Sequence, residues 1–334
     1  MSNSMVLTKE IVEQLLASGE FASDSVEEYT ELADEATAEA LSTVGGSLIL
    51  CGLTSISDAA AEALAKNCDF LNLSGLTSIS DAAAEALAKH CDELRLDGLT
   101  SISESAAKAL STQCGDLTLR GLTSISDVAA EALAKHKGDL DLGELKSISD
   151  VAAEALAKHK GDLCLGLESI SDVAAVALSR HEGRLCLDDL ESLSDNSPES
   201  LASLTAKLAQ SYCIDFYNLE QLSDIAAESL SKQECELSFY SLESLSDNAA
   251  TALGNHCGRL YLYSLVNLSD DAAIALAKHE DPLEIEGPLN LGDEAREALK
   301  KQKRRVLEWD EVVFSLEDPG SKLGDESEDD EEDD

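Results

Sequence analysis

Aromatic and basic residues are scarce in this chain of 334 residues. Aromatic side chains make up 4% of the sequence although 44% of the residues are hydrophobic, so we expect leucine and alanine to fill the core. Lysine and arginine total 24 against 67 aspartates and glutamates, which gives a net charge of −43. The basic surface of a nucleic-acid or anionic-membrane binder is therefore not expected. The acidic residues either attract a basic partner or form a solvated surface that has no specific partner.

Long hydrophobic runs and secretion signals are missing as well. No stretch reaches the ~18 apolar residues of a membrane span, and the N-terminal segment lacks the basic-then-apolar pattern of a signal peptide. The nine cysteines show no C-x-x-C spacing, which is typical of reduced thiols. We therefore expect a cytoplasmic protein that does not associate with a membrane.

An internal repeat of about 23 residues dominates the chain. We count the first residue of each L-x-L as repeat position 0. Eleven units then start at Leu48, Leu71, Leu94, Leu117, Leu140, Leu163, Leu185, Ile214, Leu237, Leu260 and Leu283. The spacing is 23 residues except in the sixth unit, which has 22, and the seventh, which has 29 and covers residues 185–213.

Each unit combines two periodicities. Leucines at repeat positions 0 and 2 alternate with polar residues, which predicts a short strand. Alanines at positions 12 and 13 and a leucine at position 16 recur at helical spacing, which predicts a helix of about three turns. An acidic residue at position 10, such as Asp81, is expected to cap the start of the helix. A glycine near position 21, such as Gly138, is expected to end it.

One such unit cannot bury its own apolar side, so the units must stack. We predict an α/β solenoid with one parallel sheet of eleven strands, roughly 50 Å long, on the inner face and helices outside. The L-x-L strand followed by I-S-D-x-A-A-x-A-L-A resembles the leucine-rich-repeat family, specifically its bacterial branch with short helical units, over about residues 24–310. The resemblance implies a curved right-handed solenoid. The family's Asn or Cys at position 5 is leucine here (Leu53, Leu76, Leu99 and Leu122), so an apolar ladder replaces a polar one.

The segments outside the array are expected to cap it. In residues 1–47 we expect a capping helix from Thr8 to about Ala17 and a divergent first repeat. The eleven repeats follow at 48–305. The seventh unit predicts a longer helix, about Pro198–Ser211, with proline in its first turn. Residues 306–318, which hold the single tryptophan, Trp309, predict a C-terminal cap. Residues 319–334 form a disordered acidic tail, which either keeps the chain soluble or attracts basic partners.

Residues that could carry chemistry mostly follow the repeat. The chain contains no phosphate-binding loop, H-E-x-x-H or G-x-S-x-G motif. All six histidines align at position 19, where other units carry Asn or Gln, which indicates a structural role in satisfying carbonyls at helix C-termini. Four cysteines align at position 20, where other units carry Lys or Glu, which indicates exposed thiols. We therefore predict no catalytic, cofactor or metal site.

Positions 1 and 3 of each strand face the concave surface and are free to vary. Tyr217, Tyr240 and Tyr263 occupy position 3 in three successive units, Tyr261 occupies position 1, and Arg259 precedes that strand. Tyrosine is frequent in protein interfaces because it joins a rigid apolar ring to a polar tip. Alternatively, the stacked rings only stabilise neighbouring strands.

The leading hypothesis is a monomeric, non-catalytic interaction module that binds another protein, possibly a basic one, on its concave face. The function of the leucine-rich-repeat family implies the same. The alternative is an acidic spacer or assembly element without a single partner.

Overall fold

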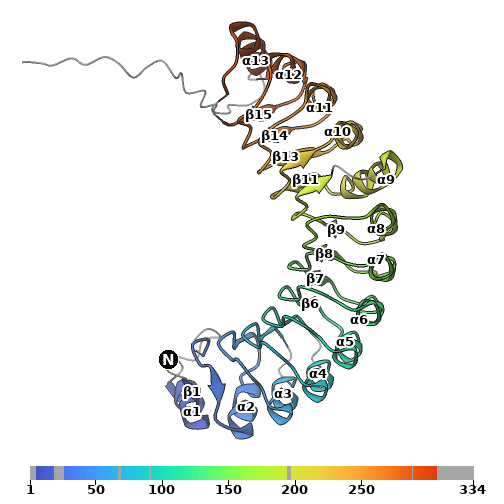
Figure 1. The fold of residues 1–334 in the computed structure, drawn as a ribbon. Coiled ribbons are helices and arrows are strands. Elements are labelled where there is room, and N and C mark those ends of the chain that lie inside the picture. The colour runs from blue at the N-terminus through green and yellow to red at the C-terminus, as the bar shows by residue number, and fades with distance from the viewer. Residues whose placement is uncertain are drawn as a thin grey trace, which may run out of the picture.

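The computed structural model describes residues 5–18, 26–66, 69–89, 92–193, 197–287 and 289–306. Its helices and strands alternate along a curved solenoid, with the strands on the inner side of the arc and the helices on the outer side (Figure 1). The predicted α/β solenoid is therefore confirmed. All eleven predicted strands are present.

The helices of the repeats are short, as the 23-residue unit requires. The helices are α1 Lys9–Ser18, α2 Glu35–Ser42, α3 Asp58–Leu64, α4 Asp81–Leu87, α5 Glu104–Leu110, α6 Asp127–Leu133, α7 Asp150–Leu156, α8 Asp172–Leu178, α9 Pro198–Leu208, α10 Asp224–Ser231, α11 Asp247–Leu253, α12 Asp270–Leu276 and α13 Asp293–Val306. Most span seven residues, about two turns, so the prediction of three turns was too long. The helix of the seventh unit is longer, with eleven residues, as predicted from its extra sequence.

The inner strands form two parallel sheets. The first sheet contains β3 Leu48–Ile49, β4 Leu71–Asn72, β5 Leu94–Arg95, β6 Leu117–Thr118, β7 Leu140–Leu142, β8 Leu163–Leu165 and β9 Leu185–Cys186. The second contains β11 Cys213–Phe216, β13 Glu236–Phe239, β14 Leu260–Leu262 and β15 Leu283–Ile285. The prediction of one continuous sheet was wrong, because β9 and β11 form no ladder with each other. The long seventh unit lies between them.

Two smaller sheets lie beside this array. At the N-terminus, β1 Val6–Leu7 pairs in parallel with β2 Glu31–Leu32, which the sequence pattern did not predict. In the region of the long unit, β10 Ser192–Leu193 pairs with β12 Gln221–Leu222. The predicted C-terminal cap beyond Val306 and the acidic tail lie outside the described residues.

Leucine and alanine form one continuous core along the arc, as the composition predicts. Leu53, Leu76, Leu99 and Leu122 at position 5 are fully buried, so the apolar ladder is confirmed. Among the largest fully buried side chains are two phenylalanines, Phe216 and Phe239. The alanines of successive helices, such as Ala83 and Ala84, are also fully buried and allow each helix to lie close to its strand.

A serine, not the aspartate, caps most repeat helices. The hydroxyl of Ser149, which precedes α7, accepts a hydrogen bond from the backbone N–H of Ala152 at 3.0 Å. The predicted capping residue Asp150 is the first helical residue, and its carboxylate accepts a hydrogen bond from Ser171 Oγ of the next unit at 2.5 Å. The expectation of an aspartate cap was therefore wrong for these helices. In α2, which precedes the eleven units, Asp34 stands in the place of the serine and accepts from the N–H of Thr37.

The glycines at position 21 do not end the helices. Helix α6 ends at Leu133, and Gly138 lies five residues further on, in the turn that leads to the next strand. A Cβ atom on Gly138 would lie 2.0 Å from the carbonyl oxygen of Gly115 in the preceding unit. The glycine is therefore needed because the turns of neighbouring units touch.

The position 19 side chains also connect neighbouring units. The Nε2 atom of His256 lies 2.8 Å from the carbonyl oxygen of Cys235, and that of His279 lies 2.9 Å from the carbonyl oxygen of Gly258. Both carbonyls belong to the turn of the preceding unit, not to the end of the histidine's own helix. Gln233 bonds a carbonyl of its own helix, that of Ser229, as predicted. The predicted role therefore holds for some units, with a different partner, while the buried ring nitrogens of His136, His159 and His181 have no hydrogen-bond partner among the described residues.

Candidate functional site

Four tyrosines gather on the concave side of the second sheet. Tyr217, Tyr240 and Tyr263 directly follow strands β11, β13 and β14, and Tyr261 lies at the centre of β14. We call these four residues the tyrosine ladder. The in-register pairing of the strands places them one above another, so the ladder is a direct product of the 23-residue spacing.

The rings of the tyrosine ladder are stacked. Ring centroids are 4.7 Å apart between Tyr217 and Tyr240, 4.9 Å between Tyr240 and Tyr263, and 5.6 Å between Tyr261 and Tyr263. Tyr217 and Tyr240 remain 46% and 38% exposed. The ladder therefore offers an ordered aromatic surface to solvent.

The backbone beneath the ladder is held from unit to unit. The carbonyl oxygen of Tyr217 accepts a hydrogen bond from Ser241 Oγ at 2.6 Å, and that of Tyr240 accepts one from Ser264 Oγ at 2.5 Å. Below the rings, the buried side chains of Phe216 and Phe239 stack at 5.4 Å. The fold itself thus holds the tyrosines in position.

Solenoid curvature explains the short ring spacing. The histidines between strand and helix, such as His136 and His159, stack with centroids 6.1 Å apart. The ladder, which lies nearer the centre of the arc, has spacings of 4.7–4.9 Å between equivalent positions. Equivalent side chains therefore come closer together on the concave face than further out.

Carboxylates surround the ladder. Partial burial together with the charge of Asp215 raises the pKa of the Tyr217 and Tyr240 phenols. Burial and the nearby charge of Glu284 raise the pKa of Tyr263 to about 12. Burial and the neighbouring Glu286 also raise the pKa of Glu284 itself. This part of the concave face is both aromatic and negatively charged.

Arg259 joins the ladder at one point. Its Nη1 atom donates a hydrogen bond of 3.5 Å to the hydroxyl of Tyr261, and its side chain is exposed. All five residues predicted as a binding surface, Tyr217, Tyr240, Tyr261, Tyr263 and Arg259, therefore lie together on one sheet. The surrounding carboxylates were not predicted as part of it, although their positions 1 and 3 in the repeat could have indicated them.

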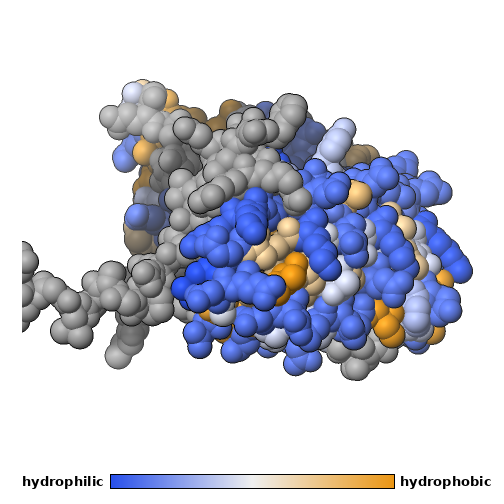
Figure 2. Space-filling model, turned by 90° about the horizontal axis from the view of Figure 1, so that it is seen from above, coloured by the Kyte–Doolittle hydropathy of each residue, from blue (hydrophilic) through white to orange (hydrophobic). Residues whose placement is uncertain are grey.

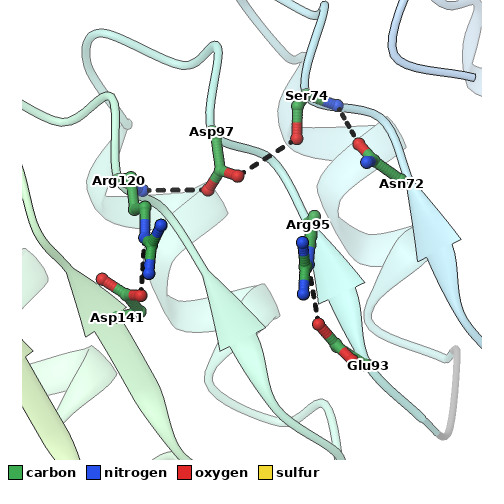
Figure 3. A network of polar contacts seen from close by, with 7 residues as sticks. All are labelled: Asn72, Ser74, Glu93, Arg95, Asp97, Arg120 and Asp141. Carbon is green, nitrogen blue, oxygen red and sulfur yellow. Dashed lines mark hydrogen bonds and ion pairs between the residues drawn. The ribbon is translucent and has the colours of Figure 1, made fainter.

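The other half of the concave face carries a network of charged and polar side chains (Figure 3). It comprises Asn72, Ser74, Glu93, Arg95, Asp97, Arg120 and Asp141. The Nε atom of Arg120 lies 2.7 Å from an oxygen of Asp141, and that of Arg95 lies 2.7 Å from an oxygen of Glu93. The Arg95 guanidinium also lies over the ring of Phe70, 5.0 Å from its centroid. These arginines are paired within the protein.

The rest of the described surface shows no metal site and no membrane-spanning helix. Seen from above, the surface is mostly hydrophilic with scattered apolar residues (Figure 2). Within the described residues, no group of three or more His, Cys, Asp or Glu side chains is placed to hold a metal ion. Cys114 and Cys257 at position 20 are exposed, as predicted, while Cys68 and Cys91 lie outside the described residues. In the described part of the chain, no helix combines the length and the apolar character needed to cross a membrane.

Known structures share the architecture but not the sequence. No protein-family model and no curated protein sequence matches this chain. The structure is similar to an internalin from Listeria monocytogenes, with a TM-score of 0.54 and 14% identity, over 88% of this chain and 92% of the internalin. A chain of the Toll–Spatzle complex from Drosophila aligns with a TM-score of 0.46 and 14% identity, over 88% of this chain and 40% of its own length. Eleven repeat strands form two in-register parallel sheets along the arc, and the backbone aligns with 92% of the internalin, so the chain has the leucine-rich-repeat fold.

Proposed function

We propose that this chain is a non-catalytic interaction module that binds another protein on its concave face, with the tyrosine ladder and Arg259 at the centre of the contact. The exposed, stacked rings of Tyr217 and Tyr240 carry this proposal. Rigid aromatic side chains contribute much of the energy of protein interfaces because they bury a large area with little loss of side-chain freedom. The concave faces of solenoids are extended binding surfaces.

The charge around the ladder favours a basic partner. Asp215 lies close enough to raise the pKa of Tyr217, Glu284 and Glu286 raise the pKa of Tyr263, and Glu286 also raises the pKa of Glu284. A lysine or arginine side chain from a partner would lie on a tyrosine ring and against a carboxylate, and both contacts are attractive. The arginines of the other half of the face, by contrast, already have carboxylate partners.

We also propose that the protein is cytoplasmic and monomeric.

Capture experiments with matched variants test the proposal. Three proteins are immobilised: the intact chain, the double variant Tyr240→Ala/Tyr263→Ala and the control Tyr212→Ala. Each is incubated with native lysate, and the proteins that bind are compared quantitatively by mass spectrometry. Tyr212 is 99% exposed and outside the ladder, so its replacement removes the same chemical group without touching the stack. We expect a defined set of basic proteins on the intact chain and on Tyr212→Ala, reduced at least about tenfold on the double variant.

Thermal unfolding of the same proteins separates binding from folding. Each stacked pair contributes about 0.5–1.5 kcal/mol at most, so the double variant should unfold only a few degrees lower than the intact chain. Equal capture by all three proteins would contradict the proposal. If sizing at increasing salt then showed self-association, the chain would instead act as an acidic assembly element, because screening removes the repulsion between its negative charges.

A further inference from the structure

Two cysteines face each other on neighbouring inner strands. Cys164 in β8 and Cys186 in β9 are in-register partners of the parallel ladder. Both side chains are half-buried on the concave face. No other register pair in the described strands joins two cysteines.

The spacing of this pair suits a disulfide. Paired residues of adjacent strands lie about 4.8 Å apart, within the range of about 4.4–6.8 Å between the Cα atoms of disulfide-bonded cysteines. As in-register partners of adjacent parallel strands, the two side chains lie on the same face of the sheet.

The two thiols are electrostatically unequal. The hydrogen bond from Cys164, aided by the positive charge of Arg184, lowers the pKa of Cys186. The same hydrogen bond, together with burial, raises the pKa of Cys164. Because the thiolate is the nucleophile in disulfide exchange, the lowered pKa makes Cys186 the more reactive thiol of the pair.

We propose that Cys164 and Cys186 form a reversible intramolecular disulfide on the concave face, with a small disulfide such as glutathione disulfide as oxidant. The Cys186 thiolate attacks one sulfur of the oxidant and displaces the first glutathione as a thiolate. Cys164 loses its proton and attacks Sγ of Cys186, which releases the second glutathione. Two protein thiols are oxidised, the oxidant is reduced to two thiols, and the two thiol protons end on the two glutathiones.

The position of the bond gives it a structural effect. Strand β9 is the last strand of the seven-stranded sheet, and β11 begins the next sheet without pairing to it. The disulfide would fasten this end strand to β8. Cys213 lines a pocket together with Cys186 on the other side of the sheet break, so it is the competing partner that the experiment must distinguish.

Oxidation of the folded full-length chain tests the proposal. The protein is equilibrated in glutathione buffers of decreasing reducing strength, free thiols are blocked by alkylation, and linked peptides are identified by mass spectrometry without reduction. We expect a cross-linked peptide containing Cys164 and Cys186, lost on adding excess reduced glutathione. Exposed Cys114 and Cys257 should give at most glutathione adducts.

Two serine variants provide the controls. In Cys164→Ser, Cys186 should accumulate as a glutathione adduct because the second thiol is missing. In Cys186→Ser, Cys164 should stay reduced under the same conditions. Circular dichroism verifies that both variants are folded. A Cys186–Cys213 link, an intermolecular link, or a stable Cys186 adduct in the unmodified chain would each overturn the proposal.

Discussion

Single glycines determine how closely the first repeats approach one another. A Cβ atom on Gly98 would lie 2.3 Å from the carbonyl oxygen of Ser74 and 2.7 Å from that of Leu76. Both are backbone atoms, so the contact is relieved only by moving whole units apart. On Gly143 the nearest atom would be a carboxylate oxygen of Asp141 at 3.1 Å, which belongs to a movable side chain.

We therefore expect Gly98→Ala to lower the free energy of unfolding by about 1–3 kcal/mol, as overpacking does elsewhere. The matched control Gly143→Ala should change it by less than about 0.5 kcal/mol. Thermal melts followed by circular dichroism measure both. Equal midpoints for the two variants would show that neighbouring units do not touch at Gly98.

The buried histidines make stability depend on pH. His136, His159 and His181 are at most 3% exposed and stacked, and burial lowers the pKa of each below the ordinary 6.5. The unfolded chain therefore takes up protons first as the pH falls. The histidine contribution to stability is fully present above pH 6.5 and is lost below it.

We expect the unfolding midpoint to fall between about pH 7 and pH 5, above the range where carboxylates take up protons. His159→Gln should weaken this dependence because glutamine does not titrate. Glutamine also fits this repeat position, as Gln113 shows by donating a hydrogen bond to the carbonyl of Asp92. The test is a set of melts across this range for both proteins. Parallel curves would mean that the histidines do not cause the pH effect.

At the scale of the helix, each serine cap serves two neighbouring units. Ser149 Oγ accepts from the N–H of Ala152 at the start of α7 and donates to Asp127 of the preceding unit at 2.5 Å. One hydroxyl thus satisfies a helix terminus and ties two helices together. This explains why serine precedes the aspartate in most units.

Ser149→Ala removes both contacts, and we expect it to lower the free energy of unfolding by about 1–2 kcal/mol. Ser203→Ala is a matched control, because Ser203 is exposed within α9 and bonds only a carbonyl of its own helix. Chemical denaturation of both variants measures the difference. A loss at Ser203 as large as at Ser149 would contradict the dual role of the cap.

For the whole molecule, the break between β9 and β11 divides the inner surface while the core continues across it. The backbone N–H of Leu163 donates to the carbonyl of Arg184, which directly precedes β9, but β9 itself has no ladder with β11. We expect the amide of Leu185 to exchange with deuterium faster than those of Leu140 and Leu163, measured by NMR or mass spectrometry under native conditions. Equal protection of all three would indicate that β9 and β11 are bonded in solution.

The strands, the helices and their order could be predicted from the sequence, because the leucine and alanine spacings repeat eleven times and stacking is the only way to bury them. The same register placed Tyr217, Tyr240, Tyr261 and Tyr263 on one face. The partners of polar groups could not be predicted in this way. Whether Asp150 caps its own helix or bonds Ser171 depends on how far apart two units lie, and the 23-residue pattern does not encode that distance.

Periodicity along the chain by itself determined the solenoid, its leucine and alanine core and the alignment of the tyrosines. Only the tertiary structure decided that the sheet divides at the long seventh unit and that equivalent side chains lie closer together on the concave face than further out. The physical reason is that a repeat specifies contacts within and between identical units. Spacings across an irregular unit and along a curved face arise from packing the whole array.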